Sequence, residues 1–424
     1  MINLFNKFFL KTKNLNSLNI EFKKIERDTE IKKIFNAIEN FSKNSEIRYV
    51  GGCVRKILNN EKYDDIDLAT NLNPHQVSEA LKKNNIKFYD TGIKHGTLTA
   101  IIDKKSFEIT SLRKDIATDG RHAEVKFSND WYEDATRRDF TINSIYSDID
   151  GNLFDPFNGK KDLDNGEIKF IGNPEKRIME DYLRVLRYVR FFLNYSQKDH
   201  NKDVIRIIKK NLGGISRISP ERLLDEFKKI TNSKKFLELA KDDVCKNIIN
   251  LIFPQFKYLE TFENLNDFAK KNIDKIDFII KISLLVIDSS DNAEYFLYKF
   301  NLSNKDKKRI LFINNFYKSK ISAKTFRKDN LKKILYFEGK QSLMDLLYYE
   351  IFKTKKFDKN IVEIINFFKN KEPNLFPYKA ANLMKKYNIN EGKELGKKLK
   401  EIEEIWVENN FKISDKEVDK IIKN

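Results

Sequence analysis

The sequence predicts an α+β protein, with a mixed β-sheet in its first part and helices throughout the remainder. Strand-like segments alternate with helical ones up to Phe154. From Pro174 onward the apolar residues recur only at helical spacing, interrupted by glycine and proline. The 424 residues are enough for about two to four domains, and 34 Phe and 17 Tyr can fill their cores. We therefore expect a mixed α/β head followed by helical domains.

Each element of the head follows from a local pattern. Apolar residues at helical spacing predict helices, and short apolar runs that end at glycine or aspartate predict strands. Pro74 is typical of a first helical position. Helices are expected at residues 28–42, 54–58, 74–83 and 137–145, and strands at 47–50 and 65–70. Hairpins are expected at 96–112, turning at 103–105, and at 145–154, turning at 150–151.

Two longer segments complete the expected head and its junction with the helices. Residues 114–130 are polar with little periodicity, which predicts a mobile loop with Gly120 as its hinge. Residues 178–192 place apolar side chains at every third or fourth position, which predicts a single helix.

Asp65 and Asp67 are the first candidates for chemistry. Alternate residues of a strand point to the same face, so the two carboxylates would lie side by side. Like charges placed together resist joint ionisation unless a cation lies between them, and Mg²⁺ prefers such oxygen ligands. Glu108 is the best candidate for a third carboxylate, because it alternates with Phe107 and Ile109. An ordinary surface strand remains an alternative for all three acids.

Two arginine-containing segments could bind an anion. The Gly51-Gly52 turn leads into a helix start, where the Gly52 backbone and Arg55 could hold a phosphate. In the predicted helix 178–192, aromatic and apolar residues separate the polar side chains, so these would lie in a partly walled cleft. The polar side chains are Asp181, Arg184, Arg187 and Arg190. Ordinary salt bridges with neighbouring acids are the alternative.

Composition limits the partner and the compartment. The net charge of +18 favours a polyanion such as RNA, DNA or an anionic membrane surface, although scattered lysine is often only solvated surface. Of the 16 arginines, 14 lie at or before Arg222, so specific recognition is expected in the first half. Two cysteines make neither a zinc site nor a disulfide framework, which favours a reducing cytoplasm. The longest apolar run, residues 278–287, is too short to span a bilayer.

Nine motifs follow one another in an order that is specific, although each motif alone is weak. They are YVGGCVRK, DDIDLAT, TGIKHGTLT, FEITSLR, DGRHAEVKF, RRDFTINSI, DPFNGKKDL, EDYLRVLRYVRF and ISPERLLDE. Over nearly its whole length the chain thereby resembles the bacterial-type (class II) CCA-adding tRNA nucleotidyltransferases and the related poly(A) polymerases. The resemblance implies a polymerase-β-like nucleotidyltransferase head followed by an all-α neck, body and tail.

The resemblance also implies a role for each candidate residue. Asp65 and Asp67 would be the Mg²⁺ ligands. Asp181 and Arg184 would read the Watson–Crick edge of the incoming base. The remaining nucleotide contacts would be Gly52, Arg55, Arg138, Arg187 and Arg190. The reaction implied is attack of an RNA 3′-hydroxyl on the α-phosphate of CTP or ATP, with loss of pyrophosphate, on a tRNA substrate and with no protein partner or membrane required.

The same resemblance divides the chain into five segments. They are an N-terminal helical extension (1–44), a catalytic head (45–155), a base-recognising neck (156–230), a body (231–325) and a basic tRNA-binding tail (326–424). Poly(A) polymerases, and partial enzymes that add only CC or only A, are separated poorly from full CCA-adding enzymes by sequence. An RNA-binding protein without catalysis is a further alternative, although it would be expected to lack one of the two aspartates.

Overall fold

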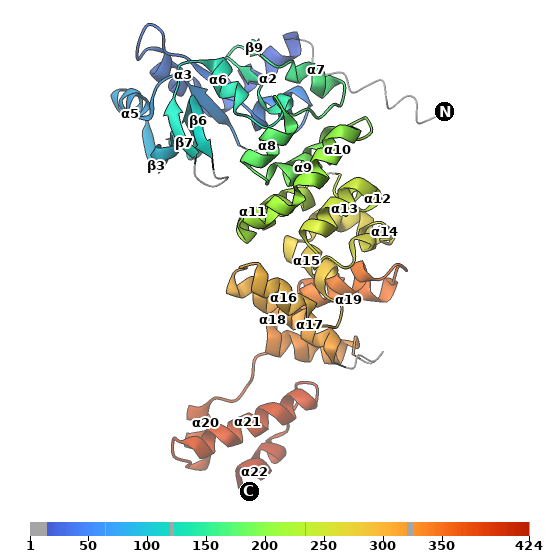
Figure 1. Ribbon diagram of the computed structural model, residues 1–424. Coiled ribbons are helices and arrows are strands. Elements are labelled where there is room, and N and C mark those ends of the chain that lie inside the picture. The colour runs from blue at the N-terminus through green and yellow to red at the C-terminus, as the bar shows by residue number, and fades with distance from the viewer. Residues whose placement is uncertain (1–14, 64, 119–122, 234, 320–324, 424) are drawn as a thin grey trace. The chain divides into compact units, whose positions relative to one another are not determined.

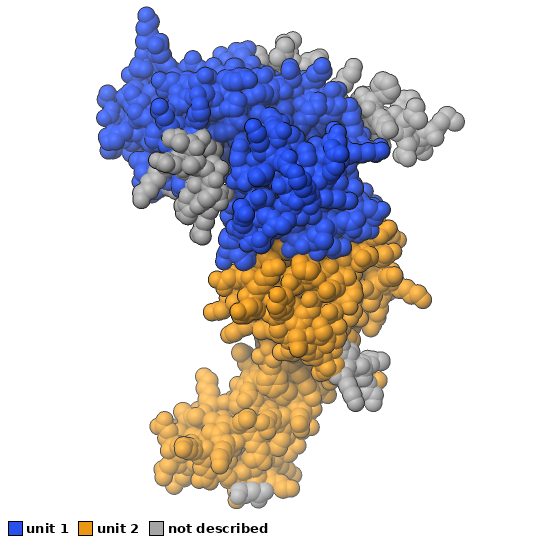
Figure 2. All heavy atoms as spheres, in the orientation of Figure 1, with its two compact units in different colours: residues 1–252 blue, residues 253–424 orange. Residues whose placement is uncertain are grey.

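The computed structural model describes residues 15–63, 65–118, 123–233, 235–319 and 325–423, and Figure 1 shows its helices and strands. The chain divides into two compact units, residues 1–252 and residues 253–424, which Figure 2 colours blue and orange. The sheet and the helices that follow it belong to unit 1, whereas the described part of unit 2 contains helices and no strand. The expected order of a mixed head and a helical remainder is confirmed.

Seven strands of unit 1 form one mixed sheet in the order β3-β4-β5-β2-β1-β8-β9, and two more form a separate hairpin. The strands are β1 (Ile47–Val50), β2 (Asp67–Thr70), β3 (Lys87–Gly92), β4 (Thr97–Ile102), β5 (Lys105–Ser111), β6 (Arg113–Thr118), β7 (Ala123–Phe127), β8 (Tyr146–Ser147) and β9 (Leu153–Phe154). β2 and β5 are parallel, and the other pairs are antiparallel. β3 was not anticipated.

The helices of unit 1 surround the sheet and then continue beyond it. They are α2 (Leu15–Thr29), α3 (Lys32–Glu39), α4 (Gly52–Leu58), α5 (Pro74–Lys83), α6 (Trp131–Thr136), α7 (Gly159–Asp164), α8 (Pro174–Glu180), α9 (Arg184–Tyr195), α10 (Lys202–Asn211), α11 (Pro220–Thr231), α12 (Glu238–Lys241) and α13 (Asp243–Ile252). Short 3₁₀ turns lie at Ile93–His95, Thr141–Asn143 and Leu212–Arg217. At the start of α5, Asn73 and Gln76 form a reciprocal capping box, and Pro74 occupies the first helical position.

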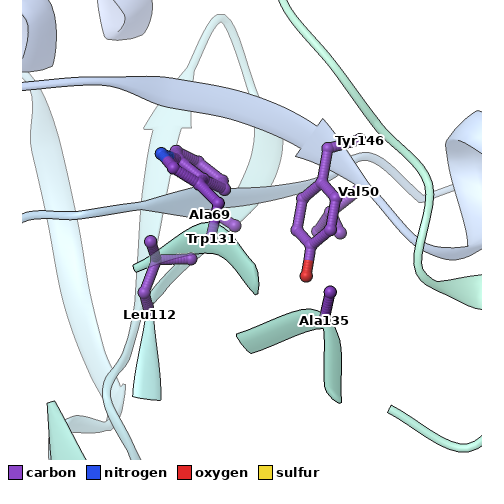
Figure 3. Packing of buried hydrophobic residues seen from close by; sticks show 6 residues of the cluster. All are labelled: Val50, Ala69, Leu112, Trp131, Ala135 and Tyr146. Atoms are coloured by element: carbon purple, nitrogen blue, oxygen red, sulfur yellow. The ribbon is translucent and has the colours of Figure 1, made fainter. Parts of the chain in front are cut away.

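The two faces of the sheet differ, and the difference positions the candidate site. On one face Tyr49 is fully buried and contacts Phe35 of α3 and Phe22 of α2. On the other face α6 packs onto the sheet through a cluster of Val50, Ala69, Leu112, Trp131, Ala135 and Tyr146 (Figure 3). Side chains alternate along a strand, so Asp67 shares the second face with Ala69.

Unit 2 consists of successive helices and ends in a segment with its own core. Its helices are α14 (Asp267–Asn272), α15 (Phe278–Val286), α16 (Asn292–Lys299), α17 (Asn304–Lys318), α18 (Lys328–Lys353), α19 (Lys359–Lys369), α20 (Ala380–Tyr387), α21 (Lys393–Glu408) and α22 (Asp415–Lys423), with 3₁₀ turns at Leu259–Phe262 and Ile273–Lys275. α18 is kinked at Gly339, whose φ is 80°. α20, α21 and α22 enclose a cluster that includes Leu395, Ile402 and Val418.

Several expected elements are wrong in detail. The helix expected over 28–42 is two helices, α2 and α3, separated at Glu30. The apolar residues at its helical spacing are nevertheless buried, namely Ile31, Ile34, Phe35 and Ile38. The helix expected over 137–145 is also wrong. α6 ends at Thr136, and the only helical turn in residues 137–145 is a 3₁₀ turn. The polar segment 114–130 supplies β6 and β7 instead of a loop. In β7, Val125 and Phe127 alternate with Glu124 and Lys126, which is the pattern of a strand. Gly120 lies outside the described residues.

Candidate active site

The carboxylates predicted to bind a metal lie at the start of β2 and on its parallel neighbour. Asp67 opens β2 and is directly paired with Glu108 of β5, so both side chains point to the α6 face. Glu108 is exposed while Phe107 and Ile109 beside it are buried, as its alternation predicted. Asp65 is exposed and precedes the strand, so the expectation of a strand from residue 65 is wrong by two residues.

The electrostatics of this group suit a bound cation. Burial raises the pKa of Asp67, and the neighbouring charges of Glu108 and Asp65 raise it further. Arg138 and Arg55 oppose that rise only partly. A divalent ion would remove the repulsion among the three carboxylates, and oxygen-only ligands are the set that Mg²⁺ prefers. The residues present therefore fit such an ion.

The Gly51-Gly52 turn between β1 and α4 brings backbone close to an arginine. Gly51 has a φ of 68°, and a Cβ on it would lie 3.4 Å from Nη1 of Arg138. A side chain at this position would therefore be strained and crowded. Gly52 begins α4, and a Cβ there would meet nothing within 4 Å, so space is open in front of the turn.

Arg55 is buried on the inner side of α4. Its guanidinium donates to Asn143 and lies 4.8 Å from the ring centre of Phe191 and 5.1 Å from that of Tyr195. Its Nε–H is buried and has no hydrogen-bond partner among the described residues. A buried cation is costly without an anionic partner, and Arg55 lines the cavity in front of the turn, so an anion there would stabilise its charge.

Asp134 on α6 holds two arginines in place. Its carboxylate accepts from Arg137 and Arg138, at nitrogen–oxygen distances of 2.7 and 3.1 Å, and from the Tyr146 hydroxyl at 2.7 Å. Burial alone would raise the pKa of Asp134, but the charges of Arg138 and Arg137 and the hydrogen bonds lower it to about 2. The Tyr146 ring therefore joins the apolar cluster of Figure 3 to this polar one.

The helix is interrupted between α8 and α9, so the expectation of one helix over 178–192 is wrong. Asp181 is extended, with φ −152° and ψ 103°. Its carboxylate accepts from the backbone N–H of Leu183 at 3.1 Å and from Arg222 of α11 at 2.8 Å. Aspartate favours such a local turn over a continued helix. Asp181 lies at the end of α8 and Arg184 begins α9. The guanidinium of Arg184 donates to Glu180, at 2.7 Å, and not to Asp181.

The two remaining arginines of α9 are each paired with a buried carboxylate. Arg187 bonds Asp139 at 2.6 Å, and Arg190 bonds Glu226 of α11 at 2.5 Å. Both guanidinium groups lie over the ring of Phe191. Burial alone would raise the pKa of Asp139, but Arg187 keeps it well below its ordinary value. Salt bridges, the alternative to ligand contact, are therefore present in all three arginines of α9. Arg184 pairs with the neighbouring Glu180, whereas Arg187 and Arg190 pair with acids that are distant in the sequence.

These groups converge on one cavity of about 540 Å³ in unit 1. Its lining joins the glycine turn, β2, the segment after α6, α9 and α11. The lining residues are Gly51, Gly52, Arg55, Asp67, Arg113, Arg137, Arg138, Asp139, Asn143, Asp181, Leu183, Arg184, Arg187, Arg190, Phe191 and Arg222. Eight arginines face three aspartates, so the cavity is suited to an anion with several negative charges.

The structure brings most of the predicted residues together and adds others. All predicted nucleotide-binding residues line the cavity. Of the three acids predicted for the metal site, Asp67 lines it, whereas Asp65 and Glu108 do not. Residues not singled out from the sequence are Arg113, Arg137, Asp139, Asn143 and Arg222. Four of them lie in the motifs RRDFTINSI and ISPERLLDE. The motifs therefore pointed to these segments, although no single residue type in them indicated a site.

The strand order and the acid-and-arginine cavity define a nucleotidyltransferase head. Residues 47–169 match the family model described as the poly A polymerase head domain. A crystal structure of the Bacillus stearothermophilus CCA-adding enzyme in complex with CTP superimposes with a TM-score of 0.71 at 21% identity, covering 93% of this chain and 97% of that one. The expected α+β fold with this head is confirmed.

Sequence relatives name the family more narrowly. The mitochondrial CCA tRNA nucleotidyltransferase 1 of Homo sapiens is 34% identical over 393 residues, which cover 90% of this chain and 87% of the relative. The CCA-adding enzyme of Staphylococcus saprophyticus is 30% identical over 306 residues, covering 71% of this chain and 72% of the relative. The chain belongs to the family of CCA tRNA nucleotidyltransferases.

No helix in the described ranges combines the length and the apolar character that crossing a membrane would require.

Replacing Asp134 with Asn should destabilise unit 1 in a pH-dependent way. A carboxylate whose folded pKa is depressed stabilises the fold above its unfolded pKa of 3.8, and this contribution is lost as the pH falls toward about 2. Near pH 7 we expect a loss of about 3 kcal/mol or more, because two partly buried arginines lose their partner. Unfolding by urea at a series of pH values measures the effect.

The difference between wild type and Asp134→Asn should shrink between pH 3.8 and about 2. Asp130→Asn is the matched control, because Asp130 caps the same helix and asparagine caps it equally well. A difference that stays constant across this pH range would contradict the assigned ion pairs.

Proposed function

We propose that this protein adds CCA to the 3′ end of tRNA, using CTP and ATP without a nucleic-acid template and releasing pyrophosphate. The observation that carries this proposal is the single cavity in which Asp67, the Gly51-Gly52 turn and eight arginines meet. A nucleoside triphosphate is the multiply charged anion that such a lining suits, and the chain belongs to the family of enzymes named for CCA addition.

The carboxylates would hold the metal. Asp65 and Asp67 are proposed as its ligands, and Glu108 as a third acid at its side, because Asp67 and Glu108 are paired across β2 and β5. Mg²⁺ is the ion proposed, since the donors are carboxylate oxygens alone. When bound, it would supply charge neutralisation at the α-phosphate and favour ionisation of the attacking 3′-hydroxyl.

The triphosphate would lie against the glycine turn. The open space in front of Gly52 admits phosphate oxygens to the backbone N–H groups there. The guanidinium groups of Arg55 and Arg138 line the same cavity and would bind the same anion. Arg187 and Arg190 would complete the positive wall while their own carboxylate partners hold them in place. Catalysis by these residues is positioning and electrostatic stabilisation.

Base selection is proposed for Asp181 and Arg184. Both side chains line the cavity from opposite sides of the break between α8 and α9. Cytosine and adenine each present an exocyclic amine beside a ring acceptor, which match a carboxylate and a guanidinium. Uracil presents a carbonyl oxygen in place of the amine and would be repelled by Asp181. One pair of side chains can therefore accept two bases and reject a third.

Unit 2 is proposed to hold the tRNA. Backbone phosphate contacts position an RNA without reading its sequence, which suits an enzyme that serves every tRNA. The basic tail segment 326–424, with exposed lysines on α21 such as Lys397 and Lys400, is the proposed contact surface. The expected subdivision of the helices into neck, body and tail stays a prediction. A cytoplasmic location also stays a prediction, because the human and mouse relatives are named as mitochondrial.

Product length will distinguish CCA addition from its alternatives. With Mg²⁺, CTP and ATP, a tRNA that lacks its 3′ end should gain three nucleotides and then stop. CTP alone should give two additions, and ATP alone should give little product on this substrate. Resolving the products on a sequencing gel measures this, and long A tracts would instead identify a poly(A) polymerase. Failure to extend with any nucleotide would support an RNA-binding protein without catalysis.

Asp65→Ala and Asp67→Ala should each abolish addition while tRNA binding stays close to wild type. Removing a metal-ligating carboxylate lowers transition-state stabilisation, and a loss of about 1,000-fold or more in turnover is expected. Glu108→Gln tests the third acid, and Glu79→Ala on the exposed face of α5 is the control that should change nothing. Turnover near wild type in Asp67→Ala would refute the metal assignment.

Arg184→Ala should impair the choice of base more than the binding of tRNA. The ratio of kcat/KM for CTP over UTP is expected to fall by about 10-fold or more, which corresponds to one good bidentate base contact. Arg184→Lys should lose most of the same discrimination, because lysine keeps the charge but not the planar fork. Arg206→Ala, an exposed arginine on α10 outside the cavity, should leave the ratio unchanged. An unchanged ratio in both Arg184 variants would exclude the role.

A further inference from the structure

Three potential metal ligands meet in unit 1 away from the nucleotide cavity. His200 lies between α9 and α10, Asp242 precedes α13, and Cys245 lies in the first turn of that helix. One ligand atom from each residue can be chosen so that all three lie within 4.8 Å of one another. None of the three lines the cavity that contains Asp67. The proposed nucleotidyl transfer therefore leaves them without a role.

The spacing of the three ligand atoms suits a tetrahedral ion. Nε2 of His200 lies 3.1 Å from each oxygen of Asp242 and 3.8 Å from Sγ of Cys245. Around a zinc ion with bonds of about 2.0–2.3 Å, tetrahedral ligand atoms lie roughly 3.2–3.8 Å apart. Only small movements of the side chains would therefore be needed to bind an ion between them.

Neighbouring groups orient two of the ligands as they do in protein metal sites. The Tyr188 hydroxyl bonds Nδ1 of His200 at 3.0 Å, which directs Nε2 toward the other two residues. The ring of Phe192 stacks on the imidazole with centroids 3.5 Å apart. The backbone N–H of Cys245 donates to Oδ1 of Asp242 at 2.8 Å, and Oδ2 contacts the Nε2 of His200. Such outer contacts fix the orientation of ligands and raise metal affinity.

An open position lies beside the cluster. A cavity of about 650 Å³ is lined by His200 and Asp242, together with Phe192, Ile205 and several basic residues. Cys245 is buried behind them. A water or an anion entering from this cavity could complete the coordination, as in zinc sites with three protein ligands. Sγ of Cys53, the other cysteine, bonds the backbone oxygens of Val50 and Asp67, and within the described residues it belongs to no such group of metal ligands.

We propose that His200, Asp242 and Cys245 form a binding site for a thiophilic divalent cation, with Zn²⁺ as the preferred ion and a solvent molecule as fourth ligand. A thiolate and an imidazole favour Zn²⁺ over Mg²⁺, so the site differs in chemistry from the three carboxylates of the head. The cysteine count alone argued against a zinc site, but this one needs a single cysteine because His200 and Asp242 supply the other ligands. On binding, the thiol of Cys245 loses its proton to solvent, and His200 binds through Nε2 as the neutral tautomer whose proton lies on Nδ1 and is donated to the Tyr188 oxygen. The bound ion would tie the segment after α9 to the start of α13.

The test uses the full-length protein, stripped with a chelator and kept in excess Mg²⁺ so that the head carboxylates are occupied. Zn²⁺ affinity is measured by competition with a chromogenic chelator, and Co²⁺ is used to detect a sulfur-to-cobalt charge-transfer band. Wild type and Cys53→Ser should bind one equivalent and show the band. Cys245→Ser should lose the band and bind Zn²⁺ about 100-fold more weakly or worse, and Tyr188→Phe about 10-fold more weakly.

A thermal-unfolding series in the same buffer separates lost ligation from lost folding. Added Zn²⁺ should raise the midpoint of wild type and of Cys53→Ser but not that of Cys245→Ser. If Cys245→Ser does not fold, His200→Gln, which keeps a polar group at the same place, should also lose the band. Absence of the band in folded wild type, or an equal band in Cys245→Ser, would overturn the proposal. Neither result depends on whether the protein extends tRNA.

Discussion

The site depends on buried carboxylates that hold arginines close together against their mutual repulsion. Asp134 pairs with Arg137 and Arg138, and its carboxylate is almost fully buried. Asp139 does the same for Arg187, and Glu226 for Arg190. Each of these acids is covered by protein, so solvent screens the pairing little and the guanidinium groups stay oriented. These three acids pair with four of the eight arginines that line the cavity of about 540 Å³, and so offset part of the repulsion among them.

The pairing leaves the cavity prepared for a ligand. Three aspartates and eight arginines line it, so positive charge exceeds negative charge on its walls. Negative charge gathers at the edge of the cavity that Asp67 lines, because the pairing of β2 with β5 brings Glu108 beside Asp67. A nucleoside triphosphate with a divalent cation matches both regions at once, with its phosphates on the arginines and the cation on the acids. The proposed transfer reaction follows from this arrangement of charge.

The sequence was a good guide wherever a short pattern was sufficient. The helix at 74–83 and the strand at 47–50 were predicted with their observed bounds, since proline, capping residues and a glycine turn mark them locally. The outward position of Glu108 followed from simple alternation. It failed where a polar side chain competes with regular structure, as at Asp181, whose carboxylate bonds its own chain and Arg222. It also missed the β6–β7 pair, although Val125 and Phe127 alternate with Glu124 and Lys126 in the sequence of β7.

The order of motifs in the sequence determined the class of fold, the family and five of the eight arginines of the cavity, because these are carried by residue identity and short spacing. Only the tertiary structure decided which acid pairs with which arginine. Arg187 and Asp139 are separated by 48 positions, Arg190 and Glu226 by 36, and Asp181 and Arg222 by 41. The packing of α9 against α11 and the head brings these partners together. No local sequence pattern predicts pairs that are so far apart along the chain. For the same reason, the sequence did not predict that His200 lies next to Cys245, which is 45 residues away along the chain.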